Sequence, residues 1–257
     1  MAQTEAYKGL YAMHKYWGKK PFEQINSFIE KYSQKDDVVL DCFCGSGVTL
    51  IETIKANRKA IGIDLNPIAI KLARASISYT DISLLKKEFD LIKKKLMNII
   101  NSMYVREYDG KQTMVTHIVW KNGDPIEVWY SDDENRKKIR EGDDIDRTMT
   151  NKPSLEAKWY PTSPMFENSR INVNKNQVVS DLFTKRALVG LSLLLDEIKK
   201  VKNDSVREAL ELTLTGTLSQ ASKLVFVIRR RGKNGQGTGK AEVGSWVIGY
   251  WVPKEHF

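Results

Sequence analysis

The sequence predicts an α/β fold, and three features carry that prediction. Val38–Asp41 is an apolar run with the length of a short buried strand, a turn of small residues follows it, and a helical pattern begins at Thr49. A second apolar run, residues 60–63, follows about twenty residues later and ends in Asp64. From residue 104 the apolar period changes from helical to alternating. The chain is therefore expected to combine strand–turn–helix units with a separate β segment.

Length and composition indicate a globular protein. The 257 residues suffice for one large domain or two modest ones. No apolar run approaches the ~18 residues that span a bilayer, and no charged-then-apolar leader opens the sequence, so we expect a cytoplasmic protein with no membrane partner. The net charge of +9 suggests a polyanionic partner without identifying it.

The cysteine and histidine content argues against a metal site. Cys42 and Cys44 lie one residue apart in the small-residue turn, which suits neither a disulfide framework nor a zinc cluster. His117 stands alone in an alternating segment and is better explained as a strand residue than as a ligand. We therefore expect reduced, packed thiols and no bound metal.

The turn after the first strand has the residues of a ligand-binding loop. Gly45 and Gly47 lack a Cβ, so a ligand can approach the main chain while free N–H groups at the helix start point toward it. Asp64, at the end of the second strand, suits a ribose whose two hydroxyls need acceptors. The turn matches neither the dinucleotide fingerprint nor the Walker loop, because the required third glycine and the Gly-Lys-Ser/Thr are absent.

Taken together, Asp41-Cys-Phe-Cys-Gly-Ser-Gly47 and Ile61-Gly-Ile-Asp-Leu-Asn-Pro67 resemble the cofactor-binding half of S-adenosylmethionine-dependent methyltransferases. The closest likeness is to the amino-group DNA methylases, which act on adenine N6 or cytosine N4 and whose first motif runs Asp-Pro-Phe-x-Gly-Ser-Gly. Cys42 replaces the usual proline. Some RNA guanine or adenine methyltransferases carry a similar loop, so they remain an alternative. The resemblance implies a partial Rossmann-like class I methyltransferase core with a β-hairpin insertion and a helical recognition region.

The resemblance also implies a site for S-adenosylmethionine at the loop and the second strand end. Gly45 to Gly47 shape the loop around the methionine portion, Asp41 orients the loop or accepts from the ammonium group, and Asp64 accepts from the ribose hydroxyls. The predicted site residues in this region are Asp41, Phe43, Cys44, Gly45, Ser46, Gly47, Asp64, Leu65 and Asn66.

The segment from His14 to Pro21 resembles the Lys-Pro element that closes over the methionine end of the ligand in amino-methylases. A buried aromatic ring and a nearby cation would suit a sulfonium and a carboxylate. The cofactor-binding residues predicted here are Tyr16, Trp17, Gly18, Lys19 and Pro21. The simpler alternative is a basic loop that caps the next helix.

Helix signals continue along the first half of the chain. Pro21 is well placed as the first residue of a helix, and Asn66-Pro67 opens another that runs to Ile77. Ser83 is expected to cap an amphipathic helix that ends near residue 101.

A hairpin and two further helices are predicted in the second half. Residues 114–130 alternate around an Asn-Gly turn, which is a strong hairpin signal. Residues 131–147 look like an exposed connector, and helices are expected to begin at Ser180 and Asp204. We therefore expect a cofactor-binding part in residues 1–103, a hairpin insertion and linker in residues 104–165, and a DNA-recognition region in residues 166–257.

Residues 229–240 form a basic, glycine-rich stretch with no acidic residue. Such a loop could follow a phosphate backbone and release its counterions, although a solvated surface loop would have the same composition. The resemblance asks for double-stranded DNA as a partner, so the predicted DNA-binding residues are Arg229, Arg230, Arg231, Lys233 and Lys240.

The catalytic motif of the amino-methylases is absent from this sequence. Those enzymes hold the target amine with Asp/Asn/Ser-Pro-Pro-Tyr/Phe/Trp, and no catalytic residue is identified here. Only two cofactor-sheet strands precede the hairpin, so we expect a truncated product or one subunit of a split enzyme, inactive until a second chain supplies the catalytic half. Besides a DNA or an RNA methyltransferase, a third interpretation is a non-catalytic DNA-binding protein with a vestigial cofactor fold.

Overall fold

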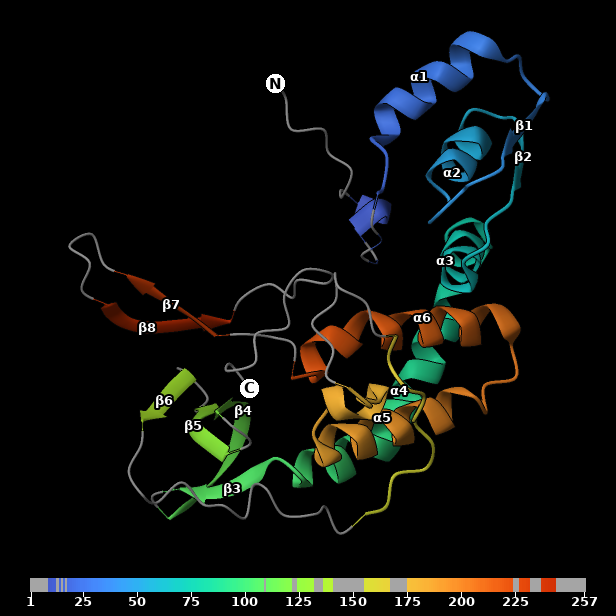
Figure 1. Ribbon diagram of the computed structural model, residues 1–257. Helices are drawn as coiled ribbons and strands as arrows, with labels where there is room; N and C mark the ends of the chain where they lie inside the picture. Colours follow the sequence, from blue (N-terminus) through green and yellow to red (C-terminus); the bar gives the residue numbers. More distant parts are fainter. Residues whose placement is uncertain are drawn as a thin grey trace. The chain divides into compact units, whose positions relative to one another are not determined.

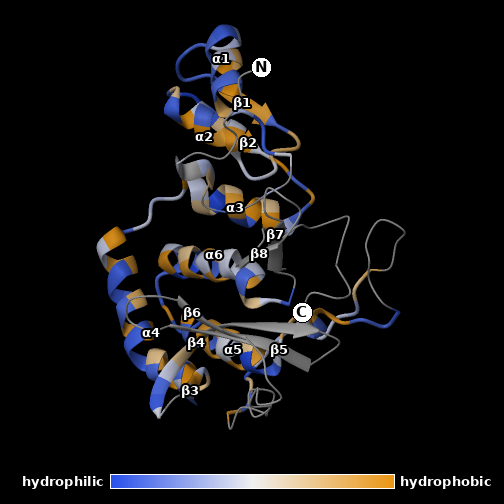
Figure 2. Cartoon of the chain, turned by 90° about the vertical axis from the view of Figure 1, so that its left-hand side faces the viewer, coloured by the Kyte–Doolittle hydropathy of each residue, from blue (hydrophilic) through white to orange (hydrophobic). Residues whose placement is uncertain are grey.

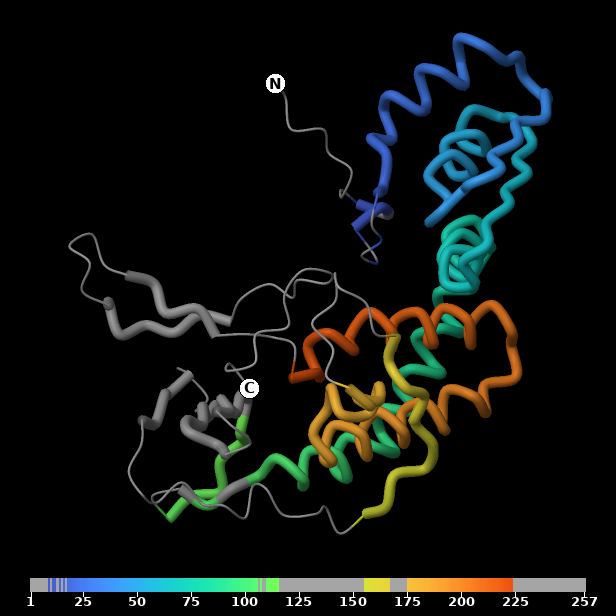
Figure 3. Tube along the Cα trace, viewed as in Figure 1, coloured from blue at the N-terminus to red at the C-terminus, as the bar shows by residue number. Residues whose placement is uncertain are grey.

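The computed structural model describes residues 9–12, 14, 16, 18–108, 110–121, 124–131, 136–140, 155–166, 175–223, 227–231 and 237–243 (Figure 1). Figure 3 traces the path of the chain through them. The chain divides into two compact units. Met1–Phe89 and Ile198–Gly216 make up the first, and Asp90–Glu197 and Thr217–Phe257 make up the second.

The first unit is built on a two-stranded parallel sheet. β1 (Val38–Asp41) pairs with β2 (Lys59–Gly62), and the register runs from Val38↔Lys59 to Asp41↔Gly62. The helix α2 (Val48–Lys55) connects the strands and packs against β2 and against the helices α1 (Phe22–Tyr32) and α3 (Pro67–Ile77). The predicted order of strand, turn, helix and second strand is therefore present, in a mixed α/β arrangement.

Local residue chemistry explains where α1 and α3 begin. Pro21 has φ −62° and precedes the first helical residue of α1 by one position, which is within the usual uncertainty of a helix boundary. Asn66 accepts a hydrogen bond at its side chain from the Ile68 amide (3.1 Å), and Pro67 occupies the first helical position. The predicted helix start at Asn66-Pro67 is confirmed.

The prediction that both strands are buried is wrong for one face of the sheet. Val38 (59% exposed), Leu40 (56%), Ile61 (51%) and Ile63 (55%) lie open to solvent, whereas Val39 and Ala60 on the opposite face are partly buried. In Figure 2, β1 is coloured as hydrophobic over most of its length. The reason is that, in the described part of the chain, β1 pairs with β2 alone and α2 covers one side of this pair.

The predicted cap of α4 (Ile82–Ser102) is also wrong. The side chain of Asp81, rather than that of Ser83, accepts hydrogen bonds from the amides of Ser83 (2.9 Å) and Leu84 (3.1 Å). Both residue types are favourable caps, and the helix begins at Ile82, two residues earlier than a cap at Ser83 would allow.

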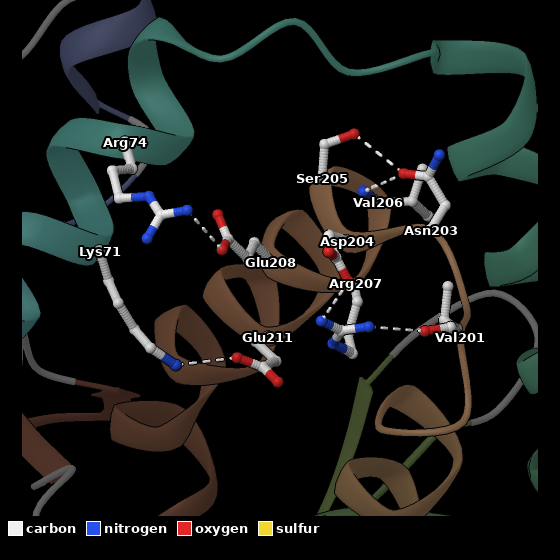
Figure 4. A network of polar contacts seen from close by, with 10 residues as sticks. All are labelled: Lys71, Arg74, Val201, Asn203, Asp204, Ser205, Val206, Arg207, Glu208 and Glu211. Atoms are coloured by element: carbon white, nitrogen blue, oxygen red, sulfur yellow. Dashed lines mark hydrogen bonds and ion pairs between the residues drawn. The ribbon is translucent and has the colours of Figure 1, made fainter.

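The helix α6 (Asp204–Ala221) begins where the sequence predicts, with the Asn203 side chain accepting from the Val206 amide at 3.0 Å. Figure 4 shows two ion pairs between α3 and α6. Lys71 bonds Glu211 (2.8 Å) and Arg74 bonds Glu208 (3.3 Å). All four side chains are partly exposed, so these ion pairs contribute little to the free energy of unfolding. Their main effect is to fix the alignment of the two helices.

The second unit contains a four-stranded antiparallel sheet in the order β3–β4–β5–β6. Its strands are β3 (Val105–Tyr108), β4 (Lys111–Lys121), β5 (Asp124–Ser131) and β6 (Arg136–Arg140). The hairpin is confirmed by the pairing of β4 with β5, and His117 lies in β4 as predicted, while the Asn-Gly turn lies outside the described residues. The expected connector instead contributes β6, a lysine- and arginine-rich edge strand of a kind that protects sheets from further pairing.

The helix predicted to begin at Ser180 is divided into two elements. A 3₁₀ turn, η3 (Val179–Leu182), is followed by α5 (Lys185–Ile198). Phe183 interrupts the helix because it is extended and forms an antiparallel bridge with Ser222. The Thr184 hydroxyl then accepts from the Ala187 amide (3.2 Å) and restarts the helix.

None of the helices in the described part of the chain combines the length and the apolar character that a membrane crossing requires.

Candidate functional site

The turn after β1 is held by hydrogen bonds from both strand ends. Asp41 accepts at its carboxylate from the Phe43 amide (3.0 Å), and the Cys44 amide donates to the Ile63 carbonyl (3.0 Å). The Gly47 amide donates to the Cys44 carbonyl (2.8 Å) at the start of α2. The loop therefore spans the carboxyl ends of two adjacent parallel strands, the edge at which open α/β sheets bind ligands.

Asp64 fastens this loop from the second strand. One carboxylate oxygen accepts from the Gly45 amide and the other from the Asn66 amide, each at 2.8 Å. Each oxygen has a further lone pair, so the carboxylate can accept additional donors from a ligand. The predicted residues Asp41, Gly45, Asp64 and Asn66 are thus brought to one edge of the sheet.

Two apolar side chains stand open at the same edge. Phe43 is 89% exposed and Leu65 is fully exposed. Exposed apolar surface is thus present next to the carboxylates of Asp41 and Asp64 in the sequence.

Cys44 and Ser46 are buried beneath the loop. Cys44 packs with Leu50 and Ala73, and burial, followed by the charges of Asp64 and Asp41, raises the pKa of its thiol. The thiol is therefore neutral and inert near pH 7. The expected packing is confirmed for Cys44 and is wrong for Cys42, which is exposed.

Both loop glycines need the conformation that they have. Gly45 has φ +52° and Gly47 has φ +85°, in the left-handed region that disfavours other residues. A Cβ on Gly45 would lie 3.1 Å from Cε1 of Tyr16, so the Tyr16 ring approaches the loop backbone closely.

The segment before α1 approaches the site through Tyr16. Gly18 has φ +73°, and the ammonium of Lys19 donates to the carbonyls of Tyr11 (2.6 Å) and His14 (2.8 Å). Lys19 thus binds backbone of its own segment, and burial lowers its pKa. Trp17, another predicted site residue, lies outside the described residues.

The sequence did not single out a buried polar cluster beside the site. Tyr11 donates through its hydroxyl to Glu52 of α2, and both residues are 4% exposed. Lys55 donates to the Tyr11 hydroxyl and to Glu52, each at 3.0 Å. The available signal was Glu52 itself, an acid in the otherwise apolar start of α2.

The two ends of the predicted basic loop are strands, and residues 232–236 between them lie outside the described residues. Arg229, Arg230 and Arg231 lie in β7 (Val227–Arg231), and Lys240 lies in β8 (Gly237–Val243). These strands pair antiparallel as a hairpin, with Arg229 opposite Ala241. Lys233 lies outside the described residues. The glycine content suggested a loop, but strand pairing between the two basic segments overrides it.

Among the described residues, no group of three histidine, cysteine or acidic side chains is arranged to hold a metal ion.

Comparison with known proteins agrees on the first part of the chain. Residues 2–75 match the N6/N4 methyltransferase family model, described as DNA methylase. Type II methyltransferase M.MjaII of Methanocaldococcus jannaschii is 28% identical over 113 residues, which are 42% of this chain and 21% of that protein. Type II methyltransferase M.BglI of Bacillus subtilis is 39% identical over 76 residues, 30% of this chain and 22% of that protein.

A ribosomal protein L11 methyltransferase of Clostridium botulinum is also similar, 31% identical over 88 residues, 34% of this chain and 24% of that protein. The chain spans about a fifth to a quarter of the length of these relatives. No solved structure matches the chain significantly. The matched region contains the loop and both strands, and it is this part of the chain that is similar to the N6/N4 DNA methyltransferase family.

Proposed function

We propose that this chain binds S-adenosylmethionine and recognises double-stranded DNA as part of a site-specific methyltransferase that modifies the exocyclic amine of adenine (N6) or cytosine (N4). The observation that carries the proposal is the pair of carboxylates, Asp41 and Asp64, at adjacent strand ends around the glycine loop. The proposed Rossmann-like character of this part of the chain is supported by the parallel pairing of β1 and β2 and by the helix that connects them.

The residues present fit this cofactor. Asp64 retains acceptor capacity for the two ribose hydroxyls after binding the Gly45 and Asn66 amides. The exposed side chains of Phe43 and Leu65 offer apolar surface to the adenine ring. Asp41 supplies negative charge near the positively charged methionine end. S-adenosylmethionine would supply the methyl group, and the chain's own residues bind and orient it.

The proposed DNA contacts come from the β7–β8 hairpin. Three arginines in one strand and a lysine in the next concentrate positive charge on a narrow ribbon. A two-stranded ribbon is narrow enough to enter a major groove or to follow the phosphates beside it. This charge favours a nucleic acid over the protein substrate named for the L11 methyltransferase relative.

We further propose that catalysis needs a segment that carries the missing Pro-Pro motif. The open face of the β1–β2 pair supports this, because parallel sheets are normally covered on both faces. The occupant would add a parallel strand beside β1 and lay a helix on Val38, Leu40, Ile61 and Ile63. Two alternatives are an RNA base methyltransferase and a non-catalytic DNA-binding protein with a vestigial cofactor fold.

Calorimetric titration with S-adenosylmethionine tests the cofactor assignment. We expect Asp64→Ala to weaken binding roughly a hundredfold, because charge-assisted hydrogen bonds to the ribose are lost along with the anchor of the loop. Asp81→Ala is the matched control, because it also removes a carboxylate that accepts two backbone amides, but at the start of α4.

The control should retain the wild-type affinity while losing stability by about 1 kcal/mol. A folded wild-type chain that binds no S-adenosylmethionine, or Asp64→Ala binding as tightly as Asp81→Ala, would contradict the cofactor site. Binding without methyl transfer by the chain alone is expected, and methyl incorporation into DNA by the purified chain would contradict the need for a second segment.

The open sheet face gives a separate prediction. Leu40 and Ile61 are paired across the strands and both are more than half exposed. The double variant Leu40→Thr/Ile61→Thr should bind several-fold less of a hydrophobic dye such as ANS, with the free energy of unfolding lowered by less than about 1 kcal/mol. Urea titration and dye fluorescence measure the two effects.

Val39→Thr is the control for this experiment, since Val39 lies on the face toward α2. It should destabilise the chain more than the double variant, because it places a hydroxyl in a packed interface. Unchanged dye binding in the double variant would show that this face is not an accessible apolar surface.

A further inference from the structure

A buried polar cluster connects the segment before α1 to α2, the helix that follows the glycine loop. The structure describes residues 9–12, 14, 16 and 18–21 of this segment. Tyr11 lies in η1 (Gly9–Ala12), and its hydroxyl donates to Glu52, 41 positions further along the chain. Lys55 donates to both groups at 3.0 Å, which compensates the burial of the Glu52 carboxylate. A buried carboxylate without hydrogen-bond partners is costly, so a movement of Tyr11 that breaks its bond to Glu52 is unfavourable. Glu52 therefore fixes the position of the Tyr11 hydroxyl.

Apolar contacts fix the Tyr11 ring in the same position. The ring stacks on Phe22 with centroids 4.7 Å apart and planes inclined by 16°. It also belongs to a buried cluster with Val48 and Ile51 of α2. Tyr11 is thus anchored both by its ring and by its hydroxyl.

Lys19 forms hydrogen bonds to the backbone of its own segment. Its ammonium donates to the carbonyls of Tyr11 and His14, at 2.6 and 2.8 Å, and is partly buried. A single side chain therefore binds the beginning and the middle of the segment. The His14 ring is in turn 3.2 Å from the hydroxyl of Thr215 on α6.

The other end of this arrangement is the glycine loop. The Tyr16 ring lies so close to Gly45 that a Cβ there would be 3.1 Å from Cε1. Gly45 in turn donates to Asp64. Glu52 lies one helical turn after Val48, where α2 leaves the loop, so the anchor and the loop share one rigid helix.

We propose that Tyr11, Glu52 and Lys19 form a latch that holds the 9–21 segment against α2 and fixes Tyr16 over the glycine loop. The three are positioning residues for S-adenosylmethionine binding, an inference that rests on the proposed function. They act by presenting a preformed wall of the site, so that the ligand does not have to order the segment when it binds.

Hydrogen exchange and calorimetry on the full chain test the latch together. Tyr11→Phe and Lys19→Met should each speed amide exchange in residues 9–21 without ligand and weaken S-adenosylmethionine binding about tenfold. Glu52→Ala should do the same. Glu52→Gln retains an oxygen that accepts from Tyr11 and should restore affinity to within about threefold of the wild type.

Ser192→Ala is the matched control, because Ser192 is a buried hydroxyl (3% exposed) in α5 that accepts from the Lys158 amide. It should change neither exchange in the segment nor affinity. Wild-type binding with unchanged affinity in Tyr11→Phe and Lys19→Met would overturn the positioning role alone. Slow exchange in both variants would overturn the latch. A folded wild-type chain that binds no S-adenosylmethionine would contradict the proposed function itself, and the positioning role with it.

Discussion

Gly47→Ala is expected to lower the free energy of unfolding by about 3 kcal/mol, as the sum of backbone strain and overpacking. Gly47 has φ +85°, and a Cβ built on it would lie 2.9 Å from the Cβ and 3.0 Å from the Cα of Ala73 in α3. Since α2 begins at the next residue, the contact cannot be relieved without moving one helix against the other. Urea titration of the variant against the wild type measures the loss.

Two further variants separate the contributions. Gly110 has a similar φ of +69° with open space around its Cα, so Gly110→Ala reports the backbone strain alone, about 1 kcal/mol. Ala73→Gly removes the Cβ, the nearer of the two Ala73 atoms that Gly47→Ala would meet, and leaves the Cα. In a double-mutant cycle with Ala73→Gly alone, the double variant should therefore recover part of the loss. A loss no larger in Gly47→Ala than in Gly110→Ala would show that close packing against α3 does not require this glycine.

Local chemistry is what the sequence predicted well. The start of α3 depends on Asn66 and Pro67, which act on residues within one turn, and the start of α6 depends on Asn203 in the same way. The acid at the end of the second strand was likewise visible from the strand pattern. Its bond to the Gly45 amide was not, because that contact depends on how two strands pair across 19 positions.

Features that depend on distant partners could not be predicted. The apolar run Val38–Asp41 looks the same whether one or both faces of its sheet are covered, so the exposure of Leu40 was missed. The charged composition of β6 and the glycines at positions 237 and 239 suggested irregular backbone, and pairing with neighbouring strands overrode both signals. Tyr11 and Glu52 are 41 positions apart, so their contact has no local signature.

The destabilisation caused by Tyr11→Phe should shrink as the pH rises. Burial, together with the hydrogen bond to Glu52, raises the pKa of the Tyr11 hydroxyl to about 12, against about 10 in an unfolded chain. Because the folded pKa is the higher one, this stabilisation is fully present below pH 10 and is lost as the pH rises through 12. The difference between a pKa of about 10 and one of about 12 corresponds to about 3 kcal/mol in the free energy of unfolding. The wild type loses this stabilisation at high pH, and Tyr11→Phe does not.

Urea titrations of both proteins between pH 8 and about pH 11.5 measure this difference. Near pH 8 the variant should be less stable by about 2 kcal/mol, because Glu52 loses a donor. The gap should stay constant up to about pH 10 and narrow between about pH 10 and pH 11.5. Tyr79→Phe is the control, because the Tyr79 ring is 87% exposed and its replacement leaves every buried contact in place. A gap between wild type and Tyr11→Phe that stays constant up to pH 11.5 would mean that Tyr11 does not bury its hydroxyl against Glu52, and the anchor of the N-terminal segment would then have to be the ring alone.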